Sequence, residues 1–127
     1  MGHINVEVTL SNPEKPDLKA EMKALVDTGA TFTVIPRDLA RKLELRSLGS
    51  VTAKTASGIE EYEEAEAKVK VMGRERTTPV LISNKLDVAL LGVVTLEVLR
   101  LKVDPTTSKV EELPLLLYTT IRSNSSR

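Results

Sequence analysis

Hydrophobic and polar residues alternate along the first part of the chain. Apolar residues stand at every second position over 4–10, with polar residues between them. This period of two is typical of a strand with one buried and one exposed face. A turn rich in proline follows over 11–17, and the alternation returns over 22–26. The pattern therefore predicts two strands joined by a turn, and the second strand leads directly to Asp27.

Further along, the pattern predicts more short strands and one or two short helices. Residues 31–35 are apolar or β-branched, and Pro36 suits the first turn of a helix whose leucines lie four residues apart. The stretches 51–56 and 59–71 read as two strands joined by a tight turn at Ser57–Gly58. The remaining predicted segments are strands at 79–82, 86–91, 101–104 and 110–118 and helical turns at 95–100. Such a succession indicates an all-β fold with minor helix.

Composition narrows the possible functions. The chain has 127 residues, about one domain, and 41% of them are hydrophobic, with so few aromatic residues that the core must be mostly aliphatic. Its 18 basic and 18 acidic residues balance, which argues against a nucleic-acid partner. The chain lacks cysteine, and its one histidine is His3, so we expect neither a metal site nor a His-based catalytic triad.

The sequence shows no sign of a signal peptide or of a membrane-spanning segment. The chain does not open with a basic segment followed by an apolar run, and no apolar stretch is long enough to span a membrane. We therefore expect a cytoplasmic protein without a membrane partner.

The stretch ALVDTGATFTVIP carries the candidate chemistry. A lone carboxylate at the end of a buried strand is costly, so Asp27 needs either a compensating partner or a function. Gly29 permits a tight turn beside it, and Thr28 offers a hydroxyl. Two carboxylates held together share a proton, so that one can act as a base toward water while the other polarises a carbonyl. The alternative is an ordinary turn aspartate that caps its neighbours.

These residues, in this order, resemble the retropepsin-like (retroviral-type) aspartic proteases, specifically the single-domain members found in cellular organisms. The resemblance rests on LVDTGATFTVIP, the helix that opens with Pro36, the hairpin TASGIEEYEEAEAKVKV and the stretch VALLGVVTLEVLRLKVDP. It implies one protease domain over 1–120, folded as a closed β-barrel-like lobe, followed by a disordered tail over 121–127.

The resemblance also implies a role for each motif. Asp27 would be the catalytic residue, and because DTG occurs once, the active form would be a homodimer with Thr28 bonded across the two-fold axis. The other implied residues are Gly29 and Ala30 in the active-site loop; Ser57, Gly58 and Ile59 in the flap; Leu90, Leu91 and Gly92 as support for the loop; and Leu115, Leu116, Leu117 and Tyr118 in the dimer interface.

Two positions depart from the viral members of that family. Those members carry an acid two residues after the DTG glycine and an arginine after the later glycine, and the two residues pair. Here the positions hold Thr31 and Val93, so both partners are missing together and no charge is left unpaired. We expect an intact catalytic loop, whereas the viral style of dimer and substrate contacts is not implied. The flap tip has one glycine, Gly58, rather than a glycine-rich run.

The leading hypothesis is an aspartic endopeptidase that cuts extended peptides or unfolded protein without metal or organic cofactor. Phe32, Val34 and Ile59 suggest apolar side-chain pockets. The five glutamates of IEEYEEAEA either favour basic substrates or form a solvated strand face. Two alternatives remain open: a non-catalytic peptide- or protein-binding dimer on the same fold, and an assembly domain that dimerises through its C-terminal strand.

Overall fold

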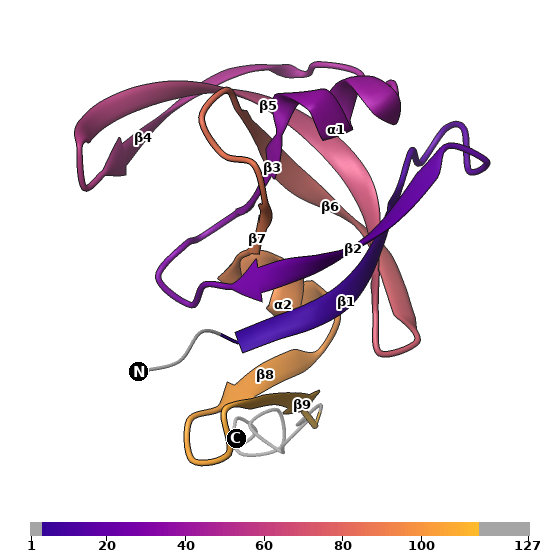
Figure 1. Cartoon of the computed structure of the whole chain (residues 1–127), viewed down its shortest axis with the longest axis vertical. Helices are drawn as coiled ribbons and strands as arrows, with labels where there is room; N and C mark the ends of the chain where they lie inside the picture. The colour runs from indigo at the N-terminus through magenta and orange to yellow at the C-terminus, as the bar shows by residue number, and fades with distance from the viewer. Residues whose placement is uncertain (1–3, 115–127) are drawn as a thin grey trace, which may run out of the picture.

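The computed structural model describes residues 4–114, and Figure 1 shows its course. This part of the chain forms nine strands and two short helices. In chain order they are β1 Ile4–Ser11, β2 Lys19–Val26, β3 Thr33–Pro36, α1 Arg37–Lys42, β4 Gly49–Thr55, β5 Gly58–Val71, β6 Arg74–Ser83, β7 Ala89–Leu91, α2 Val93–Val98, β8 Leu101–Asp104 and β9 Lys109–Glu112. Neither helix is long and apolar enough to cross a membrane.

Seven of the strands form one sheet in the order β1-β2-β7-β3-β6-β5-β4. The sheet closes on itself because β1 also pairs with β5, through Thr9 to Ser11 opposite Lys70 to Lys68. Among the described strands, β4 pairs only with β5, so the β4–β5 hairpin projects from the closed barrel (Figure 1). The prediction of an all-β, barrel-like fold is confirmed.

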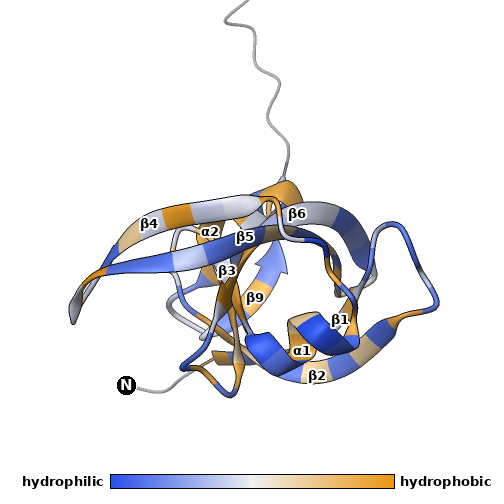
Figure 2. Cartoon of the chain, turned by 90° about the horizontal axis from the view of Figure 1, so that it is seen from above, coloured by the Kyte–Doolittle hydropathy of each residue, from blue (hydrophilic) through white to orange (hydrophobic). Residues whose placement is uncertain are grey.

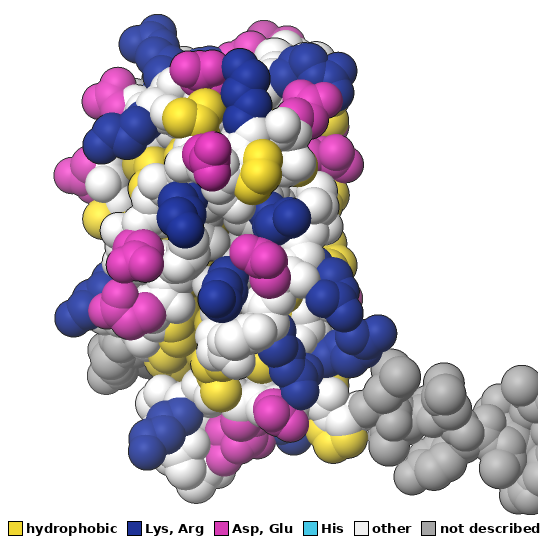
Figure 3. Space-filling view, turned by 90° about the vertical axis from the view of Figure 1, so that its right-hand side faces the viewer, with side chains coloured by type: hydrophobic (Ala, Val, Ile, Leu, Met, Phe, Trp, Pro, Cys, Tyr) yellow, Lys and Arg dark blue, Asp and Glu magenta, His cyan; other side chains and the backbone are white. Residues whose placement is uncertain are grey.

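The interior of the barrel is aliphatic, as the composition predicts. Along β5, Ala65, Ala67, Val69 and Val71 are each at most 1% exposed, while the residues between them reach the surface. Polar and apolar positions alternate in the same way along β2 (Figure 2). Full burial of each large aliphatic side chain contributes roughly 1.5–3 kcal/mol. On the face shown in Figure 3, acidic and basic side chains are interspersed, as the balanced charge leads one to expect.

Two predicted boundaries near the flap hairpin and β6 were wrong, each because backbone pairing overrides the local pattern. The flap turn is Ala56–Ser57, one residue earlier than expected, since Gly58 already pairs with Thr55. Strand β6 begins at Arg74 rather than 79, because positive φ angles at Met72 (53°) and Gly73 (78°) make a tight turn that pairs Arg74 with Val71.

The elements at the end of the described chain are also displaced from their predicted ranges. Helix α2 begins at Val93, two residues before the predicted start, directly after Gly92. Strand β9 ends at Glu112 and, among residues 4–114, pairs only with β8, in a separate two-stranded sheet. The rest of the predicted last strand, beyond residue 114, and the predicted tail over 121–127 lie outside the described residues.

Candidate active site

The backbone of Asp27 is fixed by the central strands of the barrel. Strand β7 runs parallel to β2 and pairs Leu91 with Val26. The same ladder continues one residue past β2, because the Asp27 N–H donates to the Leu91 carbonyl at 2.9 Å. Asp27 therefore stands where β2 leaves the sheet, on a backbone that is still held by a buried strand.

A tight turn then presents the Asp27 side chain. The Ala30 N–H donates to the Asp27 carbonyl at 3.0 Å, and the Gly29 N–H donates to Asp27 Oδ1 at 2.9 Å. The second contact is the capping bond of a turn aspartate, so this local geometry alone does not separate the two interpretations of Asp27. Oδ2 makes no hydrogen bond within residues 4–114, and Asp27 is half-buried while Thr28 and Gly29 are exposed. One carboxylate oxygen is thus oriented, and the other is open to a further partner.

Gly92, between β7 and α2, lets the backbone come very close to the segment that follows the Asp27 loop. A Cβ atom at this buried position would lie 2.5 Å from the Phe32 carbonyl carbon and 2.8 Å from the Thr33 nitrogen, inside van der Waals contact. The Val93 N–H donates to the Ala30 carbonyl and the Val94 N–H to the Thr31 carbonyl, both at 2.9 Å. The structure thus joins the loop to the start of α2 through main-chain bonds.

Leu90 and Leu91, the other residues predicted to support the loop, lie on β7. Leu90 pairs with Leu25 of β2 and with Val34 of β3, and Leu91 is 1% exposed. Strand β7 therefore lies between the strand that enters the Asp27 loop and the strand that leaves it.

Three buried threonines behind the loop were not anticipated from the sequence. Thr33 Oγ1 accepts the Gly92 N–H at 3.0 Å and lies 2.6 Å from Thr95 Oγ1, which is 3.3 Å from Thr78 Oγ1. Each of the three residues is at most 1% exposed. Threonine is common in strands, so the pattern gave no reason to separate these residues from ordinary strand positions. The only available signal was that Thr33 and Thr95 each stand between apolar residues, whereas Thr78 follows a polar run.

The predicted flap residues lie at the tip of the β4–β5 hairpin. Ser57, Gly58 and Ile59 are all exposed, and Ile59 is 70% exposed. The Thr55 hydroxyl closes the turn, because it accepts the Ser57 N–H at 3.2 Å and donates to the Gly58 carbonyl at 3.0 Å. The hairpin therefore has a defined end although it extends away from the barrel.

Polar contacts join this hairpin to α1 and to the loop after β6. Glu60 accepts hydrogen bonds from Lys85 Nζ at 3.2 Å and from the Tyr62 hydroxyl at 3.1 Å, and these contacts lower the pKa of Glu60. Burial, followed by the bond to Glu60, raises the pKa of Tyr62. Arg37 bridges Glu63 and Asn84.

A cavity of about 480 Å³ lies between the loop and the flap hairpin. The residues that line it are Gly29, Ala30, Thr31, Phe32, Val34, Val51, Thr52, Ala53, Lys54, Thr55, Tyr62 and Leu81. Phe32 and Val34 therefore form part of an apolar wall, as the sequence suggested. Ile59 does not line the cavity, because it lies at the exposed tip of the hairpin.

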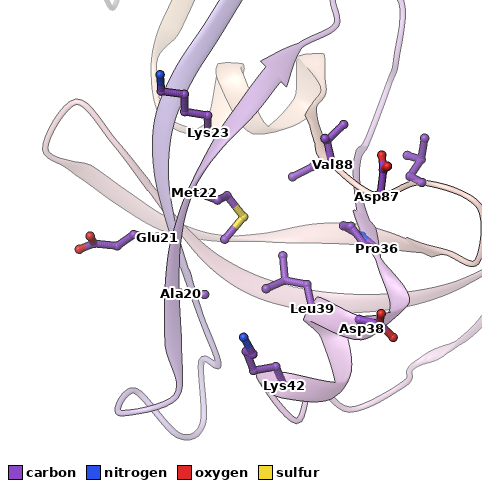
Figure 4. A pocket seen from close by; sticks show the side chains of 12 residues that line it. Ala20, Glu21, Met22, Lys23, Pro36, Asp38, Leu39, Lys42, Asp87 and Val88 are labelled. Carbon is purple, nitrogen blue, oxygen red and sulfur yellow. The ribbon is translucent and has the colours of Figure 1, made fainter.

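A second cavity, of about 430 Å³, lies on another part of the barrel (Figure 4). Met22 of β2 and Leu39 of α1 point into it, with Val88 on the third side. None of the residues from Asp27 to Ala30 lines it, so it is separate from the candidate active site.

The predicted dimer contacts divide into two groups. Thr28 is exposed on the loop and is therefore accessible to a second chain. Leu115, Leu116, Leu117 and Tyr118 lie outside the described residues, and their role stays a prediction.

Within residues 4–114, no group of three or more His, Cys, Asp or Glu side chains could hold a metal ion.

Comparison with known proteins supplies the family. The family model of the gag-polyprotein putative aspartyl protease matches residues 19–98, which include the Asp27 loop, the flap hairpin and Gly92. This match confirms the resemblance to retropepsin-like aspartic proteases. No curated protein matches the chain in sequence.

Solved structures share the fold. The EIAV protease complexed with the inhibitor HBY-793 aligns with a TM-score of 0.63 and 21% identity, over 77% of this chain and 88% of that one. The simian foamy virus (mac) protease aligns with a TM-score of 0.54 and 25% identity, over 73% and 91%. The foamy viral protease–reverse transcriptase, solved with an RNA/DNA hybrid, aligns with a TM-score of 0.57 and 19% identity, over 98% of this chain and 14% of that one.

Proposed function

Because the chain belongs to the gag-polyprotein putative aspartyl protease family, we propose that it is an aspartic endopeptidase that acts as a symmetric homodimer. The observation that carries this proposal is the position of Asp27, at the end of a central strand and in the loop whose Gly29 and Ala30 line an open cleft. The Gly29 N–H holds one oxygen of its carboxylate, and the other is left available.

The dimer follows from the single DTG motif. One carboxylate is a weak catalyst alone, and a two-fold axis beside the Asp27 loop brings in an identical one from a second chain. Two carboxylates in contact share a proton, because both cannot carry a charge at close range. The exposed Thr28 stands next to Asp27 and would bond to the partner loop.

In the reaction, the ionised carboxylate takes a proton from a water molecule, and the oxygen of that water attacks the scissile carbonyl carbon. The protonated carboxylic acid gives its proton to the carbonyl oxygen, and a tetrahedral diol forms. The C–N bond then breaks, its electron pair goes to nitrogen, and the protonated carboxyl gives its proton to the leaving amine. One hydroxyl of the diol returns its proton to a carboxylate of the pair as the carboxylic acid product forms. No covalent bond to the enzyme forms, and the pair returns to its singly protonated state.

The rest of the cleft would hold an extended peptide or an unfolded protein segment. The β4–β5 hairpin can cover the peptide and exclude water, while Phe32, Val34 and Leu81 offer an apolar wall for its side chains. An extended peptide can also bond to the strand backbones on either side.

The test is cleavage of a peptide library from about pH 3 to 8, the range over which carboxylates and their coupled pairs titrate. Wild type is compared with Asp27→Asn and with Asp17→Asn, a matched change at an exposed turn acid. We expect cleavage by wild type and by Asp17→Asn, and none by Asp27→Asn. If wild type cuts nothing at concentrations where sedimentation shows a dimer, the catalytic proposal is wrong and a peptide-binding dimer is favoured.

A further inference from the structure

The outer part of the flap hairpin extends beyond the sheet of the barrel. Strand β5 pairs with β6 only from Glu63 onward, so residues 51–62 pair only with one another (Figure 1). Among residues 4–114, one hydrogen-bonded ion pair links this outer part to a segment outside the hairpin: Lys85 Nζ donates to Glu60 Oε2 at 3.2 Å. The other side-chain bonds of residues 51–62 stay within the hairpin.

Glu60 lies on the cleft side of the hairpin. It pairs with Ala53 across the strands, and Tyr62, two residues along the same face, is the residue of β5 that lines the cavity. Because neither chain neighbour of Tyr62 lines the cavity, its side chain forms that part of the wall. The Tyr62 hydroxyl donates to Glu60 Oε1 at 3.1 Å, and the Thr55 hydroxyl lies 3.4 Å from Oε2. Glu60 therefore connects the cavity wall to Lys85.

Lys85 belongs to the segment that leads to the support of the Asp27 loop. Its backbone N–H donates to Ser83 Oγ at 3.0 Å, and Ser83 is buried at the end of β6. Residues 84–88 then lead to β7, whose last residue, Leu91, accepts the Asp27 N–H. Lys85 thus joins the hairpin to the segment that precedes this support.

We propose that Glu60 and Lys85 form a latch that positions the flap hairpin over the cleft, so that the hairpin is in place when a peptide binds. This inference rests on the proposed function. Neither residue lines the cavity, so both are positioning residues that act through the hairpin. Without the latch, the hairpin spends more time in positions that do not cover the peptide, and the apparent affinity falls with the fraction of chains in place.

The expected size of the effect follows from the exposure of the pair. The Glu60 side chain is 21% exposed and the Lys85 side chain is 74% exposed. Solvated ion pairs change an equilibrium by roughly 1.4- to fivefold. A homodimer would have one latch on each hairpin, so the two factors multiply to roughly 2- to 25-fold. Added salt should reduce the effect, because the Debye length falls from about 10 Å at 0.1 M to about 3 Å at 1 M.

The first experiment measures kcat and KM for a peptide that the library assay identifies. The variants are Glu60→Gln, Lys85→Gln and the exchanged pair Glu60→Lys with Lys85→Glu. The controls Glu61→Gln and Lys54→Gln change exposed residues on the opposite face of the hairpin. We expect both single variants to raise KM with little change in kcat, the exchanged pair to return KM toward wild type, and the controls to match wild type. Thermal unfolding of each variant confirms that it folds.

The second experiment does not depend on catalysis. Amide hydrogen exchange of residues 51–62 is measured by NMR in the Asp27→Asn background, with and without each change. We expect Glu60→Gln and Lys85→Gln to exchange faster by roughly 1.4- to fivefold, because the latch opposes opening of the hairpin. The two controls should exchange at the wild-type rate.

The outcomes separate this inference from the proposed function. If the single variants exchange like the controls, if KM is unchanged, or if the exchanged pair is no better than either single variant, the latch is wrong and the protease proposal stands. If wild type cuts no peptide, the proposed function fails, and binding of the library peptides to Asp27→Asn protein is measured by fluorescence anisotropy. Weaker binding with Glu60→Gln and Lys85→Gln would then support the latch, and equal or absent binding would overturn it.

Discussion

The hydroxyls of Thr33 and Thr95 lie 2.6 Å apart in the interior, although 62 residues separate them in the chain. Thr33 also accepts the N–H of Gly92, and Gly92 lies against the backbone of Phe32. The strand that follows the Asp27 loop is thereby joined to β7 and α2 by side-chain bonds as well as by backbone pairing. The position of the segment that follows the Asp27 loop therefore depends in part on buried polar contacts.

Thr33→Val should destabilise the protein, because valine has nearly the same shape but leaves the buried Gly92 N–H without an acceptor. An unsatisfied buried donor costs about 1–3 kcal/mol. Thr78→Val is the matched control, since the Thr78 hydroxyl contacts only Thr95, at 3.3 Å, and we expect a loss below about 1 kcal/mol. Urea unfolding measures both, and equal losses would mean that the bond to Gly92 has no special weight.

Gly92→Ala should impair folding, whereas Gly29→Ala should impair mainly activity. A Cβ at 92 meets backbone atoms of Phe32 at 2.5 and 2.6 Å, which cannot move aside, so we expect a loss of about 1–3 kcal/mol or more. A Cβ at 29 meets only Asp27 Oδ1, at 3.2 Å, and the carboxylate can rotate away. Thermal unfolding and peptide cleavage separate the two effects. A fully active and stable Gly92→Ala protein would contradict the close approach.

The sequence predicted the strands whose apolar residues alternate and whose turns hold proline or glycine. It missed the start of β6 because RERTT, over 74–78, has no apolar alternation, and its pairing with β5 depends on the tight turn at Gly73. The contacts between Thr33, Thr78 and Thr95 arise from strand pairings between distant segments, such as Thr33 with Val80. Periodicity reports which face a residue takes, but not which distant residue it meets.

Only some residues of the candidate site could be predicted from the sequence, because periodicity does not tell which distant residues meet. Asp27, Gly29 and Gly92 stand out because a charged residue or a glycine interrupts an apolar run. Tyr62 does not stand out, because aromatic residues are common in strands. Its position in the cavity wall follows from how the β4–β5 hairpin projects from the barrel (Figure 1).

Glu63 should stabilise the fold in a pH-dependent way. Arg37 and the Ser47 hydroxyl hold the pKa of Glu63 below its ordinary value of 4.5. A carboxyl with a lowered folded-state pKa contributes stability above the unfolded-state pKa, and this contribution is lost as the pH falls through the folded-state pKa. Glu63→Gln should therefore be less stable than wild type at pH 7, and the difference should shrink below pH 4.5.

Urea unfolding midpoints of both proteins at neutral and acid pH measure this difference. Glu61→Gln supplies the control for loss of one charge, since Glu61 is exposed and forms no ion pair within residues 4–114. A gap between wild type and Glu63→Gln that stays constant, or widens in acid, would show that the contact with Arg37 does not stabilise the fold.

Thr28→Ala should weaken the dimer rather than the catalytic step itself. Each Thr28 hydroxyl would form one bond to the partner loop, and loss of two equivalent bonds at about 0.5–1.5 kcal/mol each raises the dimer Kd roughly 5- to 150-fold. Sedimentation over a range of concentrations measures this shift, with Thr77→Ala as a control at an exposed threonine of β6. We expect low activity in dilute Thr28→Ala protein that recovers at high concentration, and near-normal behaviour for Thr28→Ser. Activity lost equally at all concentrations, with an unchanged Kd, would instead place Thr28 in the chemistry or in the shape of its own loop.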